Sequence, residues 1–221
     1  MSIISTTEQL HHLLSEFNKE QLADIEEAAN SGDAEACFKL GALYANGRGV
    51  KQNSAQARKW LNKAIAKQNS AARTLLGWLY LNDESLRQSD TDAIELFLLA
   101  AEAGDSDAQC SLGDIYLGGA AGIEPNPKAM LQWYNRAAQQ HHPKAQYMLG
   151  KLLAEGQVIE KNDEAAFQWL TLAIMNQSEP AQKELAMLTS RLSGDELEQY
   201  KQRMMERMPQ LQPSQAPSKS H

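Results

Sequence analysis

Hydrophobic positions in this chain follow a helical spacing, and the pattern returns after 36 or 37 residues. Residues 36–44 read Ala-Cys-Phe-Lys-Leu-Gly-Ala-Leu-Tyr, with apolar residues three and four positions apart, as on one face of an α-helix. The leading alanine of this pattern recurs at Ala72, Ala108, Ala145 and Ala181. A fixed period of this length is typical of solenoid proteins, in which similar units stack side by side.

A second apolar series in each unit predicts a second helix. In the first unit, Ala57, Trp60, Leu61, Ala64 and Ile65 form a stripe wide enough for a helix buried against neighbours. The unit therefore contains a helix over about 33–46, a glycine-rich turn at 47–50 and a second helix that begins after Asn53-Ser54. Because no stretch alternates as a strand would, antiparallel helical hairpins are predicted.

Four glycines stand at the same position of successive first helices: Gly41, Gly77, Gly113 and Gly150. A glycine inside a helix costs about 1 kcal/mol relative to alanine. Four of them in register therefore predict a compensating close approach of the first helix of each hairpin to the second.

The ends of the chain depart from the repeat. Helices are predicted over 5–17 and 19–31, and a capping box of Ser193 and Glu196 predicts a last helix over 195–208 that ends at Pro209. The expected organisation is N-terminal capping helices in 1–32, about four full repeats plus a half repeat in 33–192, a C-terminal capping helix in 193–208 and a disordered tail in 209–221.

The motifs Ala-x3-Leu-Gly-x-Leu-Tyr, Gly-x-Gly-Val and Ala-x2-Trp-Leu-x2-Ala, at a period of 36, resemble the Sel-one-like repeat (SLR) of the tetratricopeptide-like superfamily. The resemblance covers about 33–190, although the second unit lacks the glycine turn and Ala186 replaces the glycine of the fifth. It implies an all-α fold, a right-handed α/α superhelical solenoid of tetratricopeptide-like helical hairpins. It also implies a scaffold or adaptor that binds a protein or peptide, in a family whose members are mostly bacterial.

Charge and composition narrow the range of ligands. The net charge is −7, and residues 1–35 account for it with eight acidic residues against Lys19 alone. Without a basic stripe, nucleic acid is not expected as a ligand. No apolar run reaches the roughly 18 residues of a membrane helix, and the N-terminus lacks signal-peptide features, so a cytoplasmic location without membrane insertion is expected. Cys37 and Cys110 lie two repeats apart and are expected to be free thiols.

Candidate catalytic and metal-binding patterns are missing from the sequence. It contains no phosphate-binding Gly-x4-Gly-Lys-Ser/Thr, no Gly-x-Ser-x-Gly and no His-Glu-x2-His motif. His11 and His12 are adjacent on a predicted helix and point in different directions, and His141 and His142 are expected to be exposed turn residues. The sequence therefore predicts a protein without catalysis, cofactor or metal.

A partner-binding surface is predicted where the repeats differ from one another. Positions that hold similar residues in successive repeats are expected to serve packing. Positions of the first helices that differ between repeats should line the concave face of a solenoid. The candidates are Phe38, Thr74, Trp78, Leu81, Asp114, Tyr147 and Lys151. Trp78 and Leu81 could form an anchor pocket, and Asp114 and Lys151 could orient a bound peptide.

Some alternatives stay open at this point. Trp78 could instead fill space left by the glycine-free second turn, and Tyr147 could serve packing alone, whereas Trp60, Trp133 and Trp169 recur in register and are expected in the core. An acidic ridge of Glu16, Glu20, Asp24 and Glu27 is either a second binding surface or a solvated face. The expected function is a scaffold for a protein or peptide. The alternatives are an immunity-type or regulatory inhibitor of one enzyme, and a sensor of a small molecule or cell-wall fragment.

Overall fold

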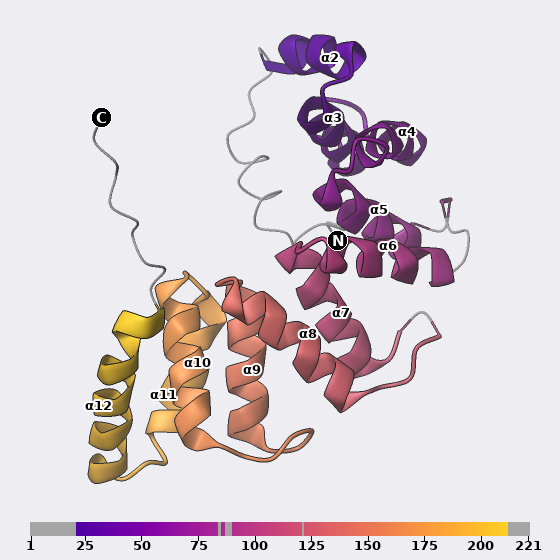
Figure 1. Cartoon of the computed structure of the whole chain (residues 1–221). Coiled ribbons are helices and arrows are strands. Elements are labelled where there is room, and N and C mark those ends of the chain that lie inside the picture. Colours follow the sequence, from indigo (N-terminus) through magenta and orange to yellow (C-terminus); the bar gives the residue numbers. More distant parts are fainter. Residues whose placement is uncertain (1–20, 84, 87–89, 121, 212–221) are drawn as a thin grey trace, which may run out of the picture. The chain divides into compact units, whose positions relative to one another are not determined.

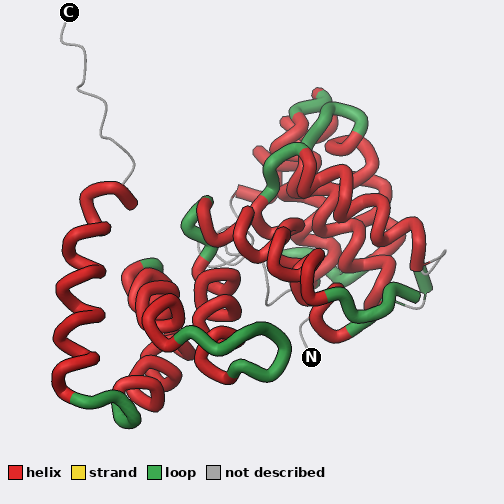
Figure 2. The backbone as a smooth tube through the Cα atoms, turned by 60° about the horizontal axis from the view of Figure 1, so that its bottom comes forward, coloured by secondary structure: helices red, strands yellow, loops and turns green. Residues whose placement is uncertain are grey.

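The computed structural model describes residues 21–83, 85–86, 90–120 and 122–211 (Figure 1). These residues form helices and no strand, joined by short loops (Figure 2). The helices are α2 (Gln21–Ser31), α3 (Ala34–Asn46), α4 (Ser54–Ile65), α5 (Ser70–Asn82), α6 (Asp90–Glu102), α7 (Ser106–Gly118), α8 (Pro127–Gln139), α9 (Pro143–Glu155), α10 (Asp163–Met175), α11 (Glu179–Thr189) and α12 (Gly194–Leu211). The protein is an all-α solenoid of helical hairpins, as predicted. The helix expected over 5–17 lies outside the described residues.

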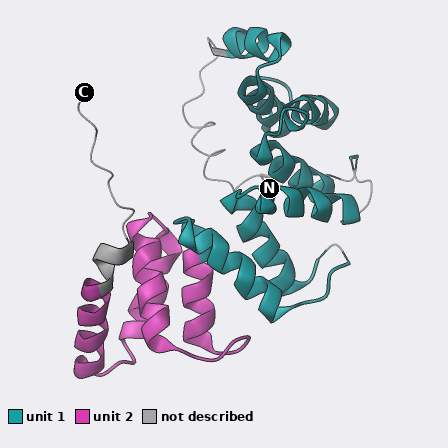
Figure 3. Cartoon of the chain, in the orientation of Figure 1, with its two compact units in different colours: residues 1–145 teal, residues 146–221 magenta. Residues whose placement is uncertain are grey.

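The chain divides into two compact units, residues 1–145 and 146–221 (Figure 3). In the first unit, α3 packs along α4, α5 along α6 and α7 along α8, which gives three consecutive hairpins. In the second unit, α10 packs against α11 and α12. Neighbouring helices in the sequence are thus neighbours in space, as expected of a fold built from stacked hairpins.

A polar side chain caps the N-terminus of nearly every helix of the repeats. Asp33, Asn69 and Asp105 each accept a hydrogen bond from the backbone N–H three residues on, over 2.7, 2.8 and 2.9 Å. Asn53, Asn126 and Asn162 cap α4, α8 and α10 in the same way. These caps satisfy donors that have no partner inside the helix, and so they define where each helix begins.

The four aligned glycines lie where the helices of each hairpin are closest, which confirms the predicted close approach. A Cβ built on Gly41 would lie 2.8 Å from Cγ of Leu61, and one on Gly150 would lie 2.7 Å from Cγ of Leu170. Phe97 and Tyr134 occupy the corresponding position opposite Gly77 and Gly113. In each hairpin, a large side chain of the second helix therefore packs directly on the backbone of the first.

The turn inside the second hairpin is built without glycine. In three other units, a glycine with positive φ ends the first helix, at Gly47, Gly119 and Gly156. In the second repeat, Asp83 follows the last residue of α5, and its Oδ1 accepts hydrogen bonds from the N–H and the hydroxyl of Ser85 at 2.9 and 2.6 Å. The Asp83 side chain thereby fixes the backbone directly after α5, where the other repeats have a glycine.

The predicted end of the last helix needs correction. Helix α12 does not end at Pro209 but continues to Leu211. A proline close to a helix end removes only one internal hydrogen bond, so the last turn can continue past it. The capping box that opens this helix is present, because Ser193 N–H donates to Glu196 Oε2 at 2.9 Å and Glu196 N–H donates to Ser193 Oγ at 3.2 Å. That α12 closes the solenoid as a cap stays a prediction.

The core contains the recurrent tryptophans. Trp60 and Trp133 are buried, and Trp169 is half-buried against the core of the second unit. Cys37 and Cys110 are buried and lie outside any disulfide, as expected. Burial raises the pKa of the Cys37 thiol, because an apolar environment disfavours the thiolate.

Candidate protein-binding surface

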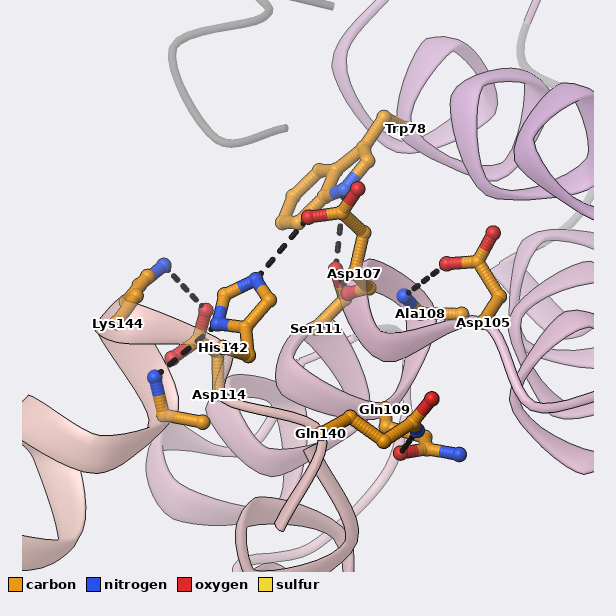
Figure 4. A network of polar contacts seen from close by, with 11 residues as sticks. Trp78, Asp105, Asp107, Ala108, Gln109, Ser111, Asp114, Gln140, His142 and Lys144 are labelled. Atoms are coloured by element: carbon orange, nitrogen blue, oxygen red, sulfur yellow. Dashed lines mark hydrogen bonds and ion pairs between the residues drawn. The ribbon is translucent and has the colours of Figure 1, made fainter. Parts of the chain in front are cut away.

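A cluster of polar side chains joins three of the first helices within residues 1–145 (Figure 4). Helix α7 is central to it, since Asp107, Ser111 and Asp114 are spaced by four and three residues and share one face of that helix. Trp78 reaches this face from α5, and His142 and Lys144 reach it from the start of α9. Successive repeats are thus linked here by side chains that are 30 to 35 residues apart in the sequence.

The Trp78 side chain is fixed by a hydrogen bond and by an aromatic contact. Its Nε1–H donates to Ser111 Oγ at 3.2 Å, and Ser111 Oγ itself donates to the Asp107 carbonyl oxygen at 2.7 Å. The indole meets the Phe97 ring edge-on, with centroids 5.3 Å apart. The side chain is half-buried, so part of a rigidly held aromatic ring is open to solvent. Trp78 therefore has a structural role in addition to any role in binding.

His142 is buried, which corrects the expectation of an exposed turn residue. Its Nδ1 accepts the Ala145 N–H at 3.2 Å, and its Nε2 lies 3.0 Å from Asp107 Oδ1. Because Nδ1 must accept, Nε2 carries the proton that is donated to Asp107. His142 occupies the same N-cap column as Asp105 one repeat earlier, and this alignment was the signal that sequence reasoning missed.

Asp114 pairs with Lys144 rather than with Lys151. The Asp114 carboxylate accepts the Tyr134 hydroxyl and the Lys144 ammonium, both at 2.6 Å. Lys151 instead lies 3.8 Å from Glu155 Oε1 on its own helix. The position of Lys144 in its repeat is occupied by different residues in the other repeats, so the sequence marks it as a candidate. Variation at a position does not show whether a charged residue pairs within its own helix or with another repeat.

Burial and the charge of Asp114 together set the ionisation of Tyr134 and Lys144. Burial raises the pKa of Tyr134, and the neighbouring Asp114 charge raises it further. Burial lowers the pKa of Lys144, but the charge and hydrogen bond of Asp114 outweigh burial, so that the net shift is upward. At neutral pH the tyrosine thus remains a hydroxyl donor and the lysine an ammonium ion. Neither group is poised to act as a nucleophile, and the cluster can bind charge and apolar surface.

The other predicted site residues are distributed over both units. Phe38 and Thr74 are only 5% and 1% exposed, so they pack in the core and cannot meet a partner in this conformation, which corrects that part of the prediction. Leu81 is half-buried against the core of the first unit. Tyr147 is half-buried against α10–α12 in the second unit, where Lys151 also lies. Trp78, Leu81 and Asp114 are therefore the predicted residues that one unit brings together.

Two further expectations concern residues away from this cluster. Of the acidic ridge, Asp24 and Glu27 are exposed on α2, whereas Glu16 and Glu20 lie outside the described residues. Within the described part of the chain, no three His, Cys, Asp or Glu side chains are close enough to hold a metal ion. No helix in that part is long and apolar enough to span a membrane.

The repeated hairpins, with aligned caps and aligned glycine contacts, define a helical-repeat solenoid of the tetratricopeptide-like class. Its particular repeat is the Sel1 repeat, whose sequence model matches residues 34–69, 70–105, 106–142 and 143–178. These four segments make up more than half of the chain, which belongs to the Sel1 repeat family. Each match begins at the N-terminal helix of a hairpin.

Two solved structures support this assignment. A protective antigen of uropathogenic Escherichia coli strains with an SLR fold is 26% identical, with a TM-score of 0.72 over 90% of this chain. This chain spans only 45% of that antigen. A Sel1 repeat protein from Oxalobacter formigenes is 29% identical, with a TM-score of 0.70, over 85% of this chain and 79% of that protein. No curated protein sequence gives a significant match.

Proposed function

We propose that this chain is a non-catalytic scaffold or adaptor that binds a protein or peptide through the first-helix face of residues 1–145. Sel1 repeat proteins generally mediate protein–protein interaction, and the family is generally a non-catalytic scaffold family. The proposal adds the surface. Trp78 and Leu81 supply apolar contact area, and the Asp114–Lys144 pair supplies two charges on the adjoining helices.

The observation that carries this proposal is the way Trp78 is held. A partly exposed indole that is fixed by Ser111 and Phe97 loses little conformational entropy when a partner covers it. Rigid aromatic residues of this kind dominate the binding energy of many protein interfaces. The charges of Asp114 and Lys144 are exposed by 26% and 39%, enough to meet a polar group of the partner at the rim of the contact.

The test compares two tryptophan variants. Tagged wild-type chain would capture its partner from the native cell, and the dissociation constant of the purified pair would then be measured by calorimetry. Trp78→Ala should weaken binding by about 2 kcal/mol, or roughly thirtyfold, as loss of an interface anchor does. Trp133→Ala, in the core, should instead lower the free energy of unfolding by about 3–5 kcal/mol and leave the affinity of the folded protein unchanged.

The two variants also define the result that would refute the surface. If Trp78→Ala unfolds at as low a temperature as Trp133→Ala, the indole serves packing alone. Full affinity in a well-folded Trp78→Ala variant would likewise show that the partner binds elsewhere.

A further inference from the structure

A hollow of about 260 Å³ opens between α4, α5 and α6 of the first unit. Leu76 and Tyr80 of α5 and Asn62 and Ile65 of α4 line one part of it, and residues of α6 line the rest. Pockets that hold whole drug-sized ligands usually exceed about 300 Å³. The hollow is therefore of a size for a single large side chain, and it lies apart from the Trp78 surface.

The hollow stands where the other repeats have a tryptophan. Leu96 of α6 lines it and occupies the column that holds Trp60, Trp133 and Trp169 in the other units. Leucine is much smaller than tryptophan, so the second repeat leaves unfilled a space that an indole fills in the other repeats. The hollow is open to solvent, so its lining atoms face water instead of a packed side chain.

The repeat positions that line the hollow have counterparts in the hydrophobic core that contains Trp133. Shifted by one repeat, the four lining residues of α4 and α5 become four residues that all pack in the cluster containing Trp133. They are Leu98, Ala101, Leu112 and Tyr116. The hollow is thus lined from the same repeat positions as the core around Trp133, with Asn62 and Ile65 in place of Leu98 and Ala101.

The charge around the hollow differs from that at Trp60 and Trp133, although Trp169 also has a leucine, Leu172, at the position of the cation. Lys63 lies 3.9 Å from the Trp60 ring centroid, and Arg136 lies 4.7 Å from that of Trp133, so that a cation covers each ring. In the second repeat, the position of this cation is occupied by Leu99, which is 48% exposed.

Two carboxylates also line the hollow. Asp92 and Glu95 belong to its lining, in columns that hold Gln56 and Lys59 in the first unit. The site that lacks its own indole and its own cation therefore presents negative charge instead. An incoming group with both an aromatic ring and a positive charge would complement it.

We propose that this hollow is a second binding site, which takes an aromatic side chain flanked by basic residues from a partner polypeptide. The incoming ring occupies the space of the absent tryptophan, between Leu96 and Tyr80. Its basic neighbours meet Asp92 and Glu95, and the exposed Leu99 covers the apolar part of the incoming segment. The site is independent of the surface around Trp78 and does not rest on the proposed function there.

The probe for this site is a capped pentapeptide, Lys-Trp-Leu-Asn-Lys, which copies residues 59–63 of the chain. Its binding to the isotope-labelled full chain would be followed by amide chemical shifts. We expect saturable shifts confined to α4, α5 and α6, and none when alanine replaces the peptide tryptophan. Trp78→Ala in the protein should leave this binding unchanged, which separates the two sites.

Two variants of the protein sharpen the test. Leu96→Trp restores the repeat pattern and should fill the hollow, weakening the peptide at least tenfold without lowering the unfolding temperature. Glu95→Lys, at an exposed position, should weaken it about fivefold. Gln132→Lys places a lysine at the equivalent position of the third repeat, with a charge change of one unit instead of two, and should have no effect.

Several results would overturn the proposal. They are absent or scattered shifts, equal binding of the alanine peptide, or unchanged affinity in a folded Leu96→Trp variant. If Leu96→Trp does not fold, the comparison of Glu95→Lys with Gln132→Lys decides alone, and equal affinities would then contradict the assigned site.

Discussion

Replacing Gly113 by alanine is expected to destabilise the protein, although alanine is the better helix former. Gly113 lies inside α7, opposite the Tyr134 ring of α8. An added Cβ would overlap two ring carbons and stand 2.8 Å from Tyr134 Cγ. Ordinary van der Waals contact begins at 3.4 Å, so even this atom would have to retreat by about 0.6 Å. Tyr134 is fully buried and its hydroxyl is bonded to Asp114, so the ring has little freedom to retreat.

The expected size follows from two opposing terms. Alanine gains about 1 kcal/mol in helix propensity. Overpacking a well-packed core typically costs about 1–3 kcal/mol, and the overlap with a ring anchored at both ends places Gly113 toward the upper end. The net loss should be about 1–2 kcal/mol, equivalent to a fall in unfolding temperature of about 2–8 °C for a chain of this size.

Thermal unfolding followed by circular dichroism measures this effect, with two matched variants. Gly118→Ala, at the exposed end of the same helix, places its Cβ where no other atom lies within 4 Å and should be neutral or stabilising. Gly77→Ala brings its Cβ to 3.1 Å from Phe97 and should destabilise less than Gly113→Ala. An unfolding temperature of Gly113→Ala equal to or above that of Gly118→Ala would refute close helix packing as the reason for the aligned glycines.

Two further substitutions use differences between repeats. Burial raises the pKa of Asp105, so the folded protein holds a proton more tightly than the unfolded chain, and stability falls as pH rises above the ordinary value of 3.8. Asp105→Asn, which keeps a cap like that of Asn69, should therefore raise the urea midpoint at pH 7 and lose this advantage near pH 3; an equal gain at both values would contradict the sign. Gln177 has a φ of 67°, and the equivalent position of the second repeat is Gly104. Gln177→Gly should therefore relieve backbone strain and raise the free energy of unfolding by about 1 kcal/mol in the same assay. A loss of stability would show that the Gln177 side chain contributes more than its backbone strain costs.

The polar cluster shows why a candidate surface is harder to predict than the fold. Trp78 and Asp114 differ from the residues at the equivalent positions of the other repeats, which predicts a role in binding, and both lie in the unit of residues 1–145. Phe38 varies in the same way and is nevertheless buried. Variation between units shows that the shared packing does not dictate a residue, but it does not show whether solvent or a neighbouring helix surrounds it.

The partners of these side chains depended on contacts that no sequence pattern contains. Lys144 is not among the binding residues that the sequence predicts, although it forms the ion pair with Asp114. His142 was expected at the surface because a histidine before a proline suggests a turn, yet it caps α9 and bonds Asp107. The first interaction joins residues 30 positions apart in the sequence, and the second joins residues 35 positions apart.

The sequence by itself determined the helices, their pairing into hairpins and the close approach at the glycines, because these features recur in every unit and each depends on spacing within one unit. Tertiary structure alone decided what differs between units: the pairing of Asp114 with Lys144, the burial of His142 and the hollow beside Leu96. The physical reason is that periodic positions are constrained by one repeated packing geometry. A side chain that departs from the repeat is placed by the particular volumes and charges of its neighbours in the adjacent repeat.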